Sequence, residues 1–151
     1  MICKARVHDV KEIHELLEQF ASKNVVLPRS LYNLYGNLRD FHIYRKDSNS
    51  PVLGFCALHI CWEDLAEIRS MVVRETVWRR GIGTKLVRKC LLEARQLGVK
   101  RVFLLTYIPS FFERFGFRMV EKSTLPQKIW ADCIHCVKFP ECDEIAMLRE
   151  P

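Results

Sequence analysis

The sequence lacks the long hydrophobic stretch of a membrane-spanning helix, and no run of five charges of one sign occurs in it. We therefore expect neither a membrane partner nor a charged arm that binds nucleic acid. Basic residues interleaved with aromatic ones, which would favour single-stranded nucleic acid, are also missing. Internal repeats and low-complexity segments are absent too, which excludes a solenoid or a linker-rich protein.

Two common phosphate-binding signatures are missing as well. The pattern GxxxxGK[ST] does not occur, which excludes a P-loop. The glycine pair Gly81 and Gly83 has no third glycine and no early β-α-β unit before it, which excludes the dinucleotide-binding fingerprint.

What the chain does have is the composition of one ordinary globular domain. Its 151 residues are 49% hydrophobic and 28% charged, which is enough for a sizeable core. We expect a single domain over residues 1–151. The formal net charge of +6 favours anionic ligands.

Cysteine is plentiful, and its distribution argues against a disulfide framework. The seven cysteines are odd in number, and no signal-peptide pattern opens the sequence. We therefore expect reduced thiols and a cytoplasmic location. Four cysteines fit core positions: Cys3, Cys56, Cys61 and Cys90.

The remaining cysteines form an unusual cluster near the C-terminal end, with Cys133, Cys136 and Cys142 around His135. This set has part of the pattern of a zinc site, but His135 stands between two cysteines and a second CxxC is missing. A redox-sensitive thiol pair is another interpretation. We favour a third one, in which the segment caps a substrate pocket and holds no metal.

The chain is organised around the stretch from Ala66 to Leu86. Its first half is rich in apolar and β-branched residues and predicts a buried strand that ends at Met71, Val72 and Val73. A basic glycine turn and a helical pattern follow. Glycines let a backbone approach a ligand closely, and the first amides of a helix attract negative charge. The pattern favours a phosphate or pyrophosphate site over an ordinary helix start, with these residues: Arg79, Arg80, Gly81, Ile82, Gly83 and Thr84.

The rest of the chain predicts an α/β protein with a mixed sheet, in the order β-α-α-β-β-β-α-β-α-β-β. Asp9 and Glu12 have the spacing of a capping box at the start of the first helix. Gly54 is a candidate bulge in a strand over Val52 to Ile60. Arg29 stands at the start of a second helix, where it is either a solvated surface residue or a clamp for a carboxylate.

These motifs resemble the GNAT acetyltransferases over most of the chain. The similarity lies in VVRETVWRRGIGTKLV, RVFLLT and FFERFGF. It implies a single domain whose mixed, mostly antiparallel central sheet is flanked by helices. It also implies that the glycine loop binds the pyrophosphate of acetyl-CoA, and that the edge of the strand at Met71 to Val73 pairs with the pantetheine. Trp78 departs from the glutamine or arginine usual at its position.

The resemblance also implies catalytic roles. Glu67 matches the general-base glutamate of GCN5-like enzymes, although a strand residue paired with an arginine is the alternative. The tyrosine that donates a proton in many GNAT enzymes is replaced by Phe112. Tyr107, Ser110 or water then remains for protonating the thiolate, and Tyr107 also fits a core aromatic.

A closer similarity is to the short bacterial N-acetylglutamate synthase-like proteins. It is carried by VLPRSLYNLYGNLRDF, FLLTYIPSFFERFGF and TLPQKIWADCIHCVKFPECDEIAM. It implies acetyl transfer from acetyl-CoA to the α-amine of L-glutamate, in arginine biosynthesis. Arg29 matches an arginine that binds the substrate carboxylate in larger synthases, and Arg69 and Lys128 are further candidates.

Other functions fit the same residues. A GNAT enzyme of this kind can act on another small amine or on a protein N-terminus. Phe112 and the cysteine cluster also fit a non-catalytic regulator that binds acyl-CoA or senses a metal. GNAT domains often dimerise through their sheets, so the resemblance allows a homodimer as well.

Overall fold

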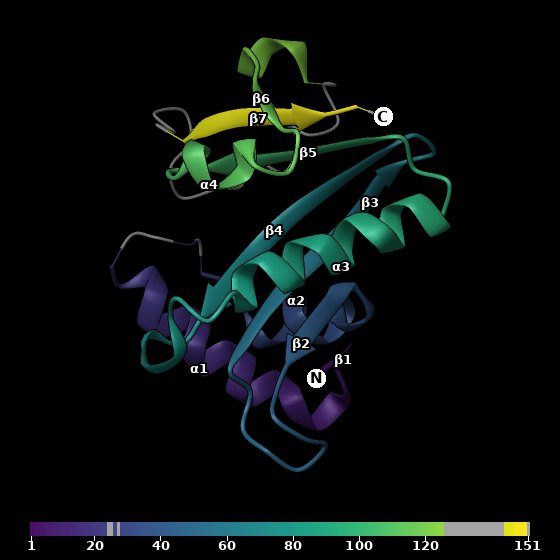
Figure 1. Cartoon of the computed structure of the whole chain (residues 1–151). Helices are drawn as coiled ribbons and strands as arrows, with labels where there is room; N and C mark the ends of the chain where they lie inside the picture. The colour runs from purple at the N-terminus through teal and green to yellow at the C-terminus, as the bar shows by residue number, and fades with distance from the viewer. Residues whose placement is uncertain (24–25, 27, 126–143, 151) are drawn as a thin grey trace.

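The computed structural model describes residues 1–23, 26, 28–125 and 144–150. Seven strands form one twisted sheet in the order β1-β2-β3-β4-β5-β7-β6 (Figure 1). Only β4 and β5 run parallel, and the other neighbouring strands are antiparallel. The strands are β1 (Ile2–Lys4), β2 (Phe41–Tyr44), β3 (Gly54–Trp62), β4 (Leu65–Val73), β5 (Arg101–Thr106), β6 (Arg118–Met119) and β7 (Ile145–Arg149).

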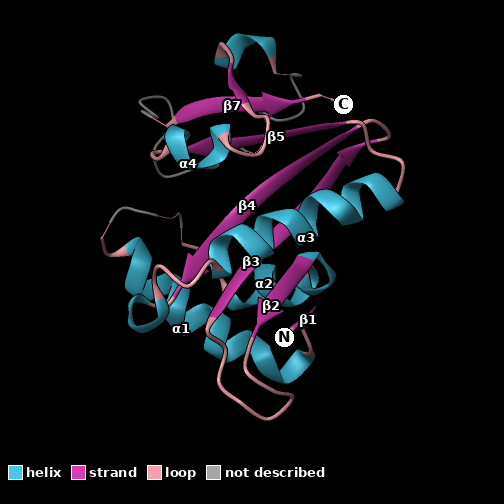
Figure 2. Cartoon of the chain, in the orientation of Figure 1, coloured by secondary structure: helices cyan, strands magenta, loops and turns pink. Residues whose placement is uncertain are grey.

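Within the described residues, four α-helices flank this sheet (Figure 2). They are α1 (Val10–Ala21), α2 (Leu31–Gly36), α3 (Ile82–Gln96) and α4 (Pro109–Glu113), and four 3-10 turns lie at Val7–Asp9, Leu38–Asp40, Glu75–Val77 and Lys122–Thr124. The order of strands and helices matches the prediction, and so does the mostly antiparallel mixed sheet with helices on its faces. Among the helices of the described ranges, none is long and apolar enough to cross a membrane.

The helices divide the core into two main layers, one on each face of the sheet. On one face α1 and α2 cover the side chains of β2 and β3 that include Phe41, Phe55 and Ala57. On the other face α3 and α4 cover Cys56, Leu58 and their neighbours. Each helix covers the sheet because apolar residues recur every three or four positions, and α1 buries these: Val10, Ile13, Leu16, Leu17 and Phe20.

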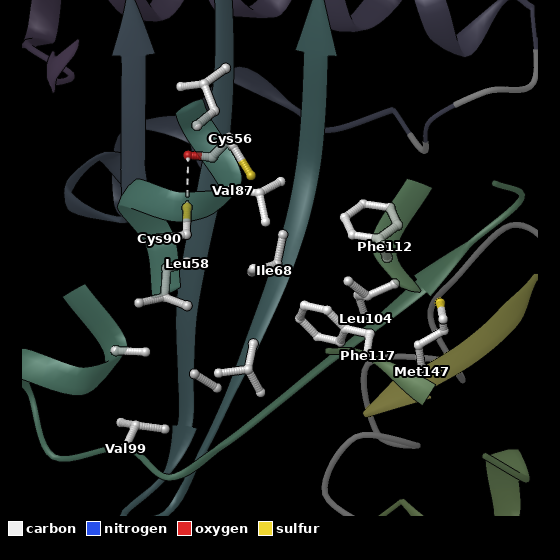
Figure 3. Close-up of a cluster of buried hydrophobic side chains, with 14 of the residues drawn as sticks. Cys56, Leu58, Ile68, Val87, Cys90, Val99, Leu104, Phe112, Phe117 and Met147 are labelled. Carbon is white, nitrogen blue, oxygen red and sulfur yellow. Dashed lines mark hydrogen bonds between the residues drawn. The ribbon is translucent and has the colours of Figure 1, made fainter. Parts of the chain in front are cut away.

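The layer under α3 accounts for two of the cysteines and for the unusual phenylalanine (Figure 3). Cys56 and Cys90 are fully buried, and the Cys90 thiol donates to the Cys56 carbonyl at 4.0 Å. The neighbouring Cys56 side chain, as a hydrogen-bond partner, and burial raise the pKa of the Cys90 thiol well above its ordinary value. The prediction that both are core residues is confirmed, whereas Cys3 and Cys61 are only half-buried. Phe112 is 5% exposed and packs edge-on against Phe117.

A bulge in β4 changes which way its side chains point. Phe55 pairs with Val72 and Ala57 with Arg69, so one residue of β3 faces two residues of β4, Ser70 and Met71. The extra residue reverses the alternation of the strand, since Ile68 faces the α3 layer before the bulge and Met71 does so after it. The bulge expected at Gly54 is therefore wrong in position.

Just before the bulge, β4 and β5 separate. Their parallel pairing covers only three positions and ends where Glu67 meets Phe103. Both strands continue past this point, β4 to Val73 and β5 to Thr106, and they diverge (Figure 1). On the side toward β5, the backbone of residues 68–73 consequently has no neighbouring strand among the described residues.

The capping box expected at the start of α1 is not formed. The Asp9 side chain makes no cap hydrogen bond to the helix. It accepts instead from the backbone N–H of Arg6 at 2.8 Å, and it forms a buried ion pair with Arg45 at 2.7 Å. Glu12 accepts from the backbone N–H of Val52 at 3.1 Å. Both carboxylates therefore join the helix to distant segments.

His42 is a buried polar residue under α3, and it should make the free energy of unfolding depend on pH. It is 3% exposed, its Nε2 lies 3.1 Å from a Glu93 oxygen, and its Nδ1 has no hydrogen-bond partner among the described residues. Burial and the charge of Lys4 lower the pKa of His42 below its ordinary value of 6.5, although Glu93 opposes the shift.

A histidine with a lowered pKa in the folded state stabilises the fold fully above its unfolded pKa, and it loses this contribution as the pH falls below that value. We expect the urea midpoint to decrease between about pH 7.5 and about pH 5.5, and to decrease less in His42→Gln. Equal decreases in the two proteins would contradict this prediction.

Candidate active site

The glycine turn before α3 has the backbone of an anion site. Gly81 precedes the helix at φ 77°, and Arg79 has φ 68°. Positive φ is costly for a residue with a side chain, and such strain is concentrated at functional sites. The helix that follows has 15 residues, so the free amides of its first turn and its dipole both favour negative charge there. Arg79, Arg80 and Gly81 are exposed.

Neighbouring residues attach this turn to the rest of the site. The indole N–H of Trp78 donates to the Val73 carbonyl at 2.7 Å, which ties the turn to the end of β4. Trp78 thus has a structural contact where related loops carry a polar residue. On the other side, α4 packs closely against the start of α3. A Cβ added at Gly83 would lie 3.5 Å from the Phe111 ring of α4. Arg114 donates to the Thr84 hydroxyl at 3.3 Å.

Gly81→Ala tests the turn. Alanine at a positive φ costs about 1–2 kcal/mol, and the strain moves the first helical amides out of position. We expect the KM for acetyl-CoA to rise about tenfold, the ratio that corresponds to 1.4 kcal/mol. The KM for the amine should stay nearly constant. Gly36→Ala is the matched control, because open space surrounds Gly36. Equal effects of the two substitutions would contradict a special role for Gly81.

Below the turn, the divergence of β4 and β5 leaves one edge of β4 without a neighbouring strand in the described part of the chain. The side chains of Met71 and Val73 pack toward the α3 layer, and Val72 packs into the opposite layer. Their backbone, rather than their side chains, is therefore what a ligand between the strands can meet. An extended chain with alternating amide groups, such as pantetheine, fits an edge of this kind.

On the α2 side of the sheet, Arg29 is held by three contacts. Its Nε donates to the Asn33 side-chain oxygen at 2.7 Å, and its Nη1 donates to the Ser70 hydroxyl at 3.1 Å. Its guanidinium lies 5.3 Å from the centre of the Phe41 ring. The interpretation of Arg29 as a solvated surface residue is therefore wrong. Ser70 has φ 56°, so it is the second residue of the site, after Arg79, with a strained backbone.

Arg29 and Arg69 form a positive pair with unused donors. The Nη2 of Arg29 and the Nε of Arg69 are buried and have no hydrogen-bond partner within the described ranges. Burial, and next the charge of Arg69, lower the pKa of Arg29 to about 10, while Asp40 and Glu67 oppose this shift. Buried donors without partners are costly, so an anion that accepts from both would be stabilised here.

Glu67 lies at the point where the two strands separate. It is the last residue of β4 that pairs with β5, and its side chain is 17% exposed. Its carboxylate is 3.7 Å from Nη1 of Arg69, so the expected ion pair with an arginine does form. A carboxylate at this position can also accept a proton from an amine bound beside Arg69.

The residues expected to protonate the leaving thiolate lie past the end of β5. Tyr107 directly follows that strand and is 37% exposed, which does not fit a core aromatic. Ser110 is an exposed residue in the first turn of α4. Lys128 lies outside the described residues, as do Cys133, His135, Cys136 and Cys142. The described residues contain no group of side chains suited to hold a metal ion.

Sequence reasoning missed the residues that orient the arginines. Asn33 follows Arg29 by four positions at the start of a helix, and this spacing could have suggested the contact. Ser70 and the hydrogen bond between His59 and Asp40 carry no comparable signal, since they depend on how distant segments pack.

Comparison with known proteins shows the family of this chain. A model of the acetyltransferase (GNAT) family matches residues 10–117. An uncharacterized N-acetyltransferase of Chlorobaculum tepidum is 41% identical over 145 residues, which cover 96% of this chain and 92% of the relative. An amino-acid acetyltransferase of Mycobacterium tuberculosis is 34% identical over 131 residues, or 86% of this chain and 75% of that one.

Solved structures have the same fold. Rv2747 of Mycobacterium tuberculosis, crystallised with CoA, superposes with a TM-score of 0.85 at 28% identity, over 100% of this chain and 99% of that one. An N-acetylglutamate synthase of Neisseria gonorrhoeae, complexed with CoA and N-acetyl-glutamate, gives a TM-score of 0.88 at 24% identity, over 99% of this chain and 34% of that one. The second likeness shows the fold alone. With a family model over most of its length and these relatives, the chain belongs to the GNAT family, as an N-acetyltransferase that uses acetyl-CoA.

Proposed function

We propose that this enzyme transfers the acetyl group of acetyl-CoA to the α-amine of L-glutamate. The observation that carries the proposal is the pair of buried donors without partners, on Arg29 and Arg69, beside Glu67. A guanidinium binds a carboxylate through two parallel hydrogen bonds, and two such groups suit an acceptor with two carboxylates.

The names of relatives support the same class of acceptor. The 34% identical protein of Mycobacterium tuberculosis is named an amino-acid acetyltransferase. Several further proteins of that name are matched over 28–29% of their length, so this chain corresponds to about a quarter of each. A role in arginine biosynthesis and a cytoplasmic location are part of the proposal and rest on this likeness and on the free thiols expected from the sequence.

The chemistry requires two protons to leave the ammonium nitrogen and one proton to reach the sulfur, so that each turnover releases one proton. An ammonium cannot attack a thioester, so Glu67 takes a proton from the bound substrate. The amine nitrogen then forms a bond to the acetyl carbonyl carbon, the carbon–sulfur bond breaks, and the nitrogen loses its second proton to water, which offsets the proton that the thiolate gains. Tyr107, Ser110 or water supplies the proton to the CoA thiolate. Gly81 and the first amides of α3 hold the pyrophosphate, and the edge of β4 at Met71, Val72 and Val73 aligns the pantetheine.

The test is CoA release by the purified protein with separate acceptors. L-Glutamate, L-glutamine, L-aspartate, L-lysine and spermidine differ in the number and spacing of their carboxylates and amines. We expect turnover with L-glutamate well above that with the others, since L-glutamine and L-lysine have one carboxylate, spermidine has none, and the two of L-aspartate lie one methylene closer together.

Other outcomes would select other functions. Turnover with spermidine or lysine would overturn the substrate assignment and keep the acetyltransferase. Turnover with L-glutamine alone would show that a single carboxylate is bound. Binding of acetyl-CoA without turnover of any acceptor would favour the non-catalytic regulator.

A further inference from the structure

A histidine–carboxylate pair lies next to the site on the same face of the sheet. The Nδ1 of His59, in β3, is 2.7 Å from a carboxylate oxygen of Asp40, which ends the 3-10 turn before β2. Their side chains are 29% and 21% exposed. So short a contact with an ionised carboxylate places a proton on Nδ1, which leaves Nε2 of the neutral ring as a proton acceptor.

The sheet register brings this histidine to Glu67. His59 and Glu67 are direct partners in the antiparallel pairing of β3 and β4. Directly opposite residues project from the same face, with their Cβ atoms about 5 Å apart. At that separation, a carboxylate and an imidazole reach each other directly or through one water molecule.

The charges around the pair are those of the acceptor site itself. Asp40 and Glu67 are both close enough to act on the charge of Arg29, and so is Arg69. Two carboxylates and two guanidiniums therefore lie around the acceptor site, and one of the guanidiniums, that of Arg69, pairs with Glu67 at 3.7 Å.

We infer that Asp40 and His59 form a relay that removes the substrate proton from Glu67. Each turnover leaves Glu67 protonated, and it must lose that proton before the next amine binds. The proton passes from the Glu67 carboxyl to Nε2 of His59 and then to solvent, while Asp40 holds the ring and stabilises the imidazolium. His59 acts through Glu67, so it is a positioning residue. This inference rests on the proposed function of Glu67 as the base.

The test compares His59→Ala and Asp40→Asn with wild type on the best acceptor of the panel. His59→Ala should lower kcat about tenfold or more, with the KM for acetyl-CoA unchanged. Asp40→Asn should lower kcat less, because the ring remains. The matched control is His14→Ala, since His14 also pairs with a carboxylate, that of Glu18 at 3.5 Å, but lies on α1. The control should keep wild-type kinetics.

Added imidazole distinguishes a relay from a structural role. It should restore most of the kcat of His59→Ala in proportion to its concentration, and it should leave wild type unchanged. A circular dichroism spectrum like that of wild type shows that the variant is folded. If kcat is unchanged in His59→Ala, or if it falls and imidazole does not restore it, the relay is overturned.

The same experiment separates this inference from the proposed function. Turnover with an acceptor other than L-glutamate overturns the substrate alone, and the variants on that acceptor still decide the relay. An unchanged pH profile in Glu67→Gln, together with imidazole rescue of His59→Ala, would overturn Glu67 as the base and make His59 the first proton acceptor, which also overturns the relay as stated. No turnover with any acceptor overturns both.

Discussion

Glu67→Gln should lower kcat about a hundredfold or more near neutral pH, which is the contribution typical of a general base. Glutamine has nearly the same shape but cannot take a proton from the ammonium. The deficit should shrink as the pH rises toward the pKa of the free amine, because the acceptor then arrives already deprotonated. The measurement is the pH dependence of kcat for both proteins, with acetyl-CoA and acceptor at saturation.

The exposed Glu63 provides a control for this substitution, since it lies in the turn between β3 and β4 and away from Arg69. Glu63→Gln should have wild-type rates at every pH. The proposed base would be ruled out by pH profiles that run parallel for Glu67→Gln and wild type.

Arg29→Ala should raise the KM for the acceptor and leave the KM for acetyl-CoA nearly constant. A hydrogen bond to a charged group contributes about 1.5–3 kcal/mol, so the KM should rise about 10- to 100-fold. The effect should be confined to the acceptor because Arg29 lies on the α2 side of the sheet, held by Asn33 and Ser70. The glycine turn lies across the sheet, at the start of α3.

Two further variants make this prediction specific. Arg29→Lys should recover only part of the affinity, because an ammonium keeps the charge but lacks the planar fork. Arg95→Ala removes an exposed arginine from the last turn of α3 and should change neither KM. A rise of both KM values by the same factor in Arg29→Ala would contradict a carboxylate clamp.

Local patterns predicted most of the fold correctly. The order of elements follows from apolar spacing, and the strand–turn–helix unit around Gly81 follows from glycine and arginine placement. The error at Asp9 has a physical cause. A capping box requires the carboxylate to stay with its own helix, but a buried arginine 36 positions away, Arg45, competes successfully for Asp9. Arg45 lies too far along the sequence to enter a prediction based on the residues around Asp9.

The site was predicted less completely than the fold, for a similar reason. Arg29 and Arg69 were both candidates, but their proximity depends on how the segment before α2 contacts β4 at Ser70. The bulge in β4 also eluded prediction, because it is formed by Ser70 and not by the glycine that such sites often use. His59 could not be identified as a site residue from the sequence, because only the strand register places it opposite Glu67.

Because of the bulge at Ser70, the number of residues in β4 decides which face of the sheet each of its side chains occupies. Substitutions along the strand change one side chain at a time. A single-codon deletion at Ser70 would shift the phase of every residue on one side of it. Glu67 and Arg69 would then turn toward the apolar layer under α3, or Met71 and Val73 would turn away from it. Natural variation in this enzyme should therefore be rich in replacements along β4 and free of insertions or deletions there.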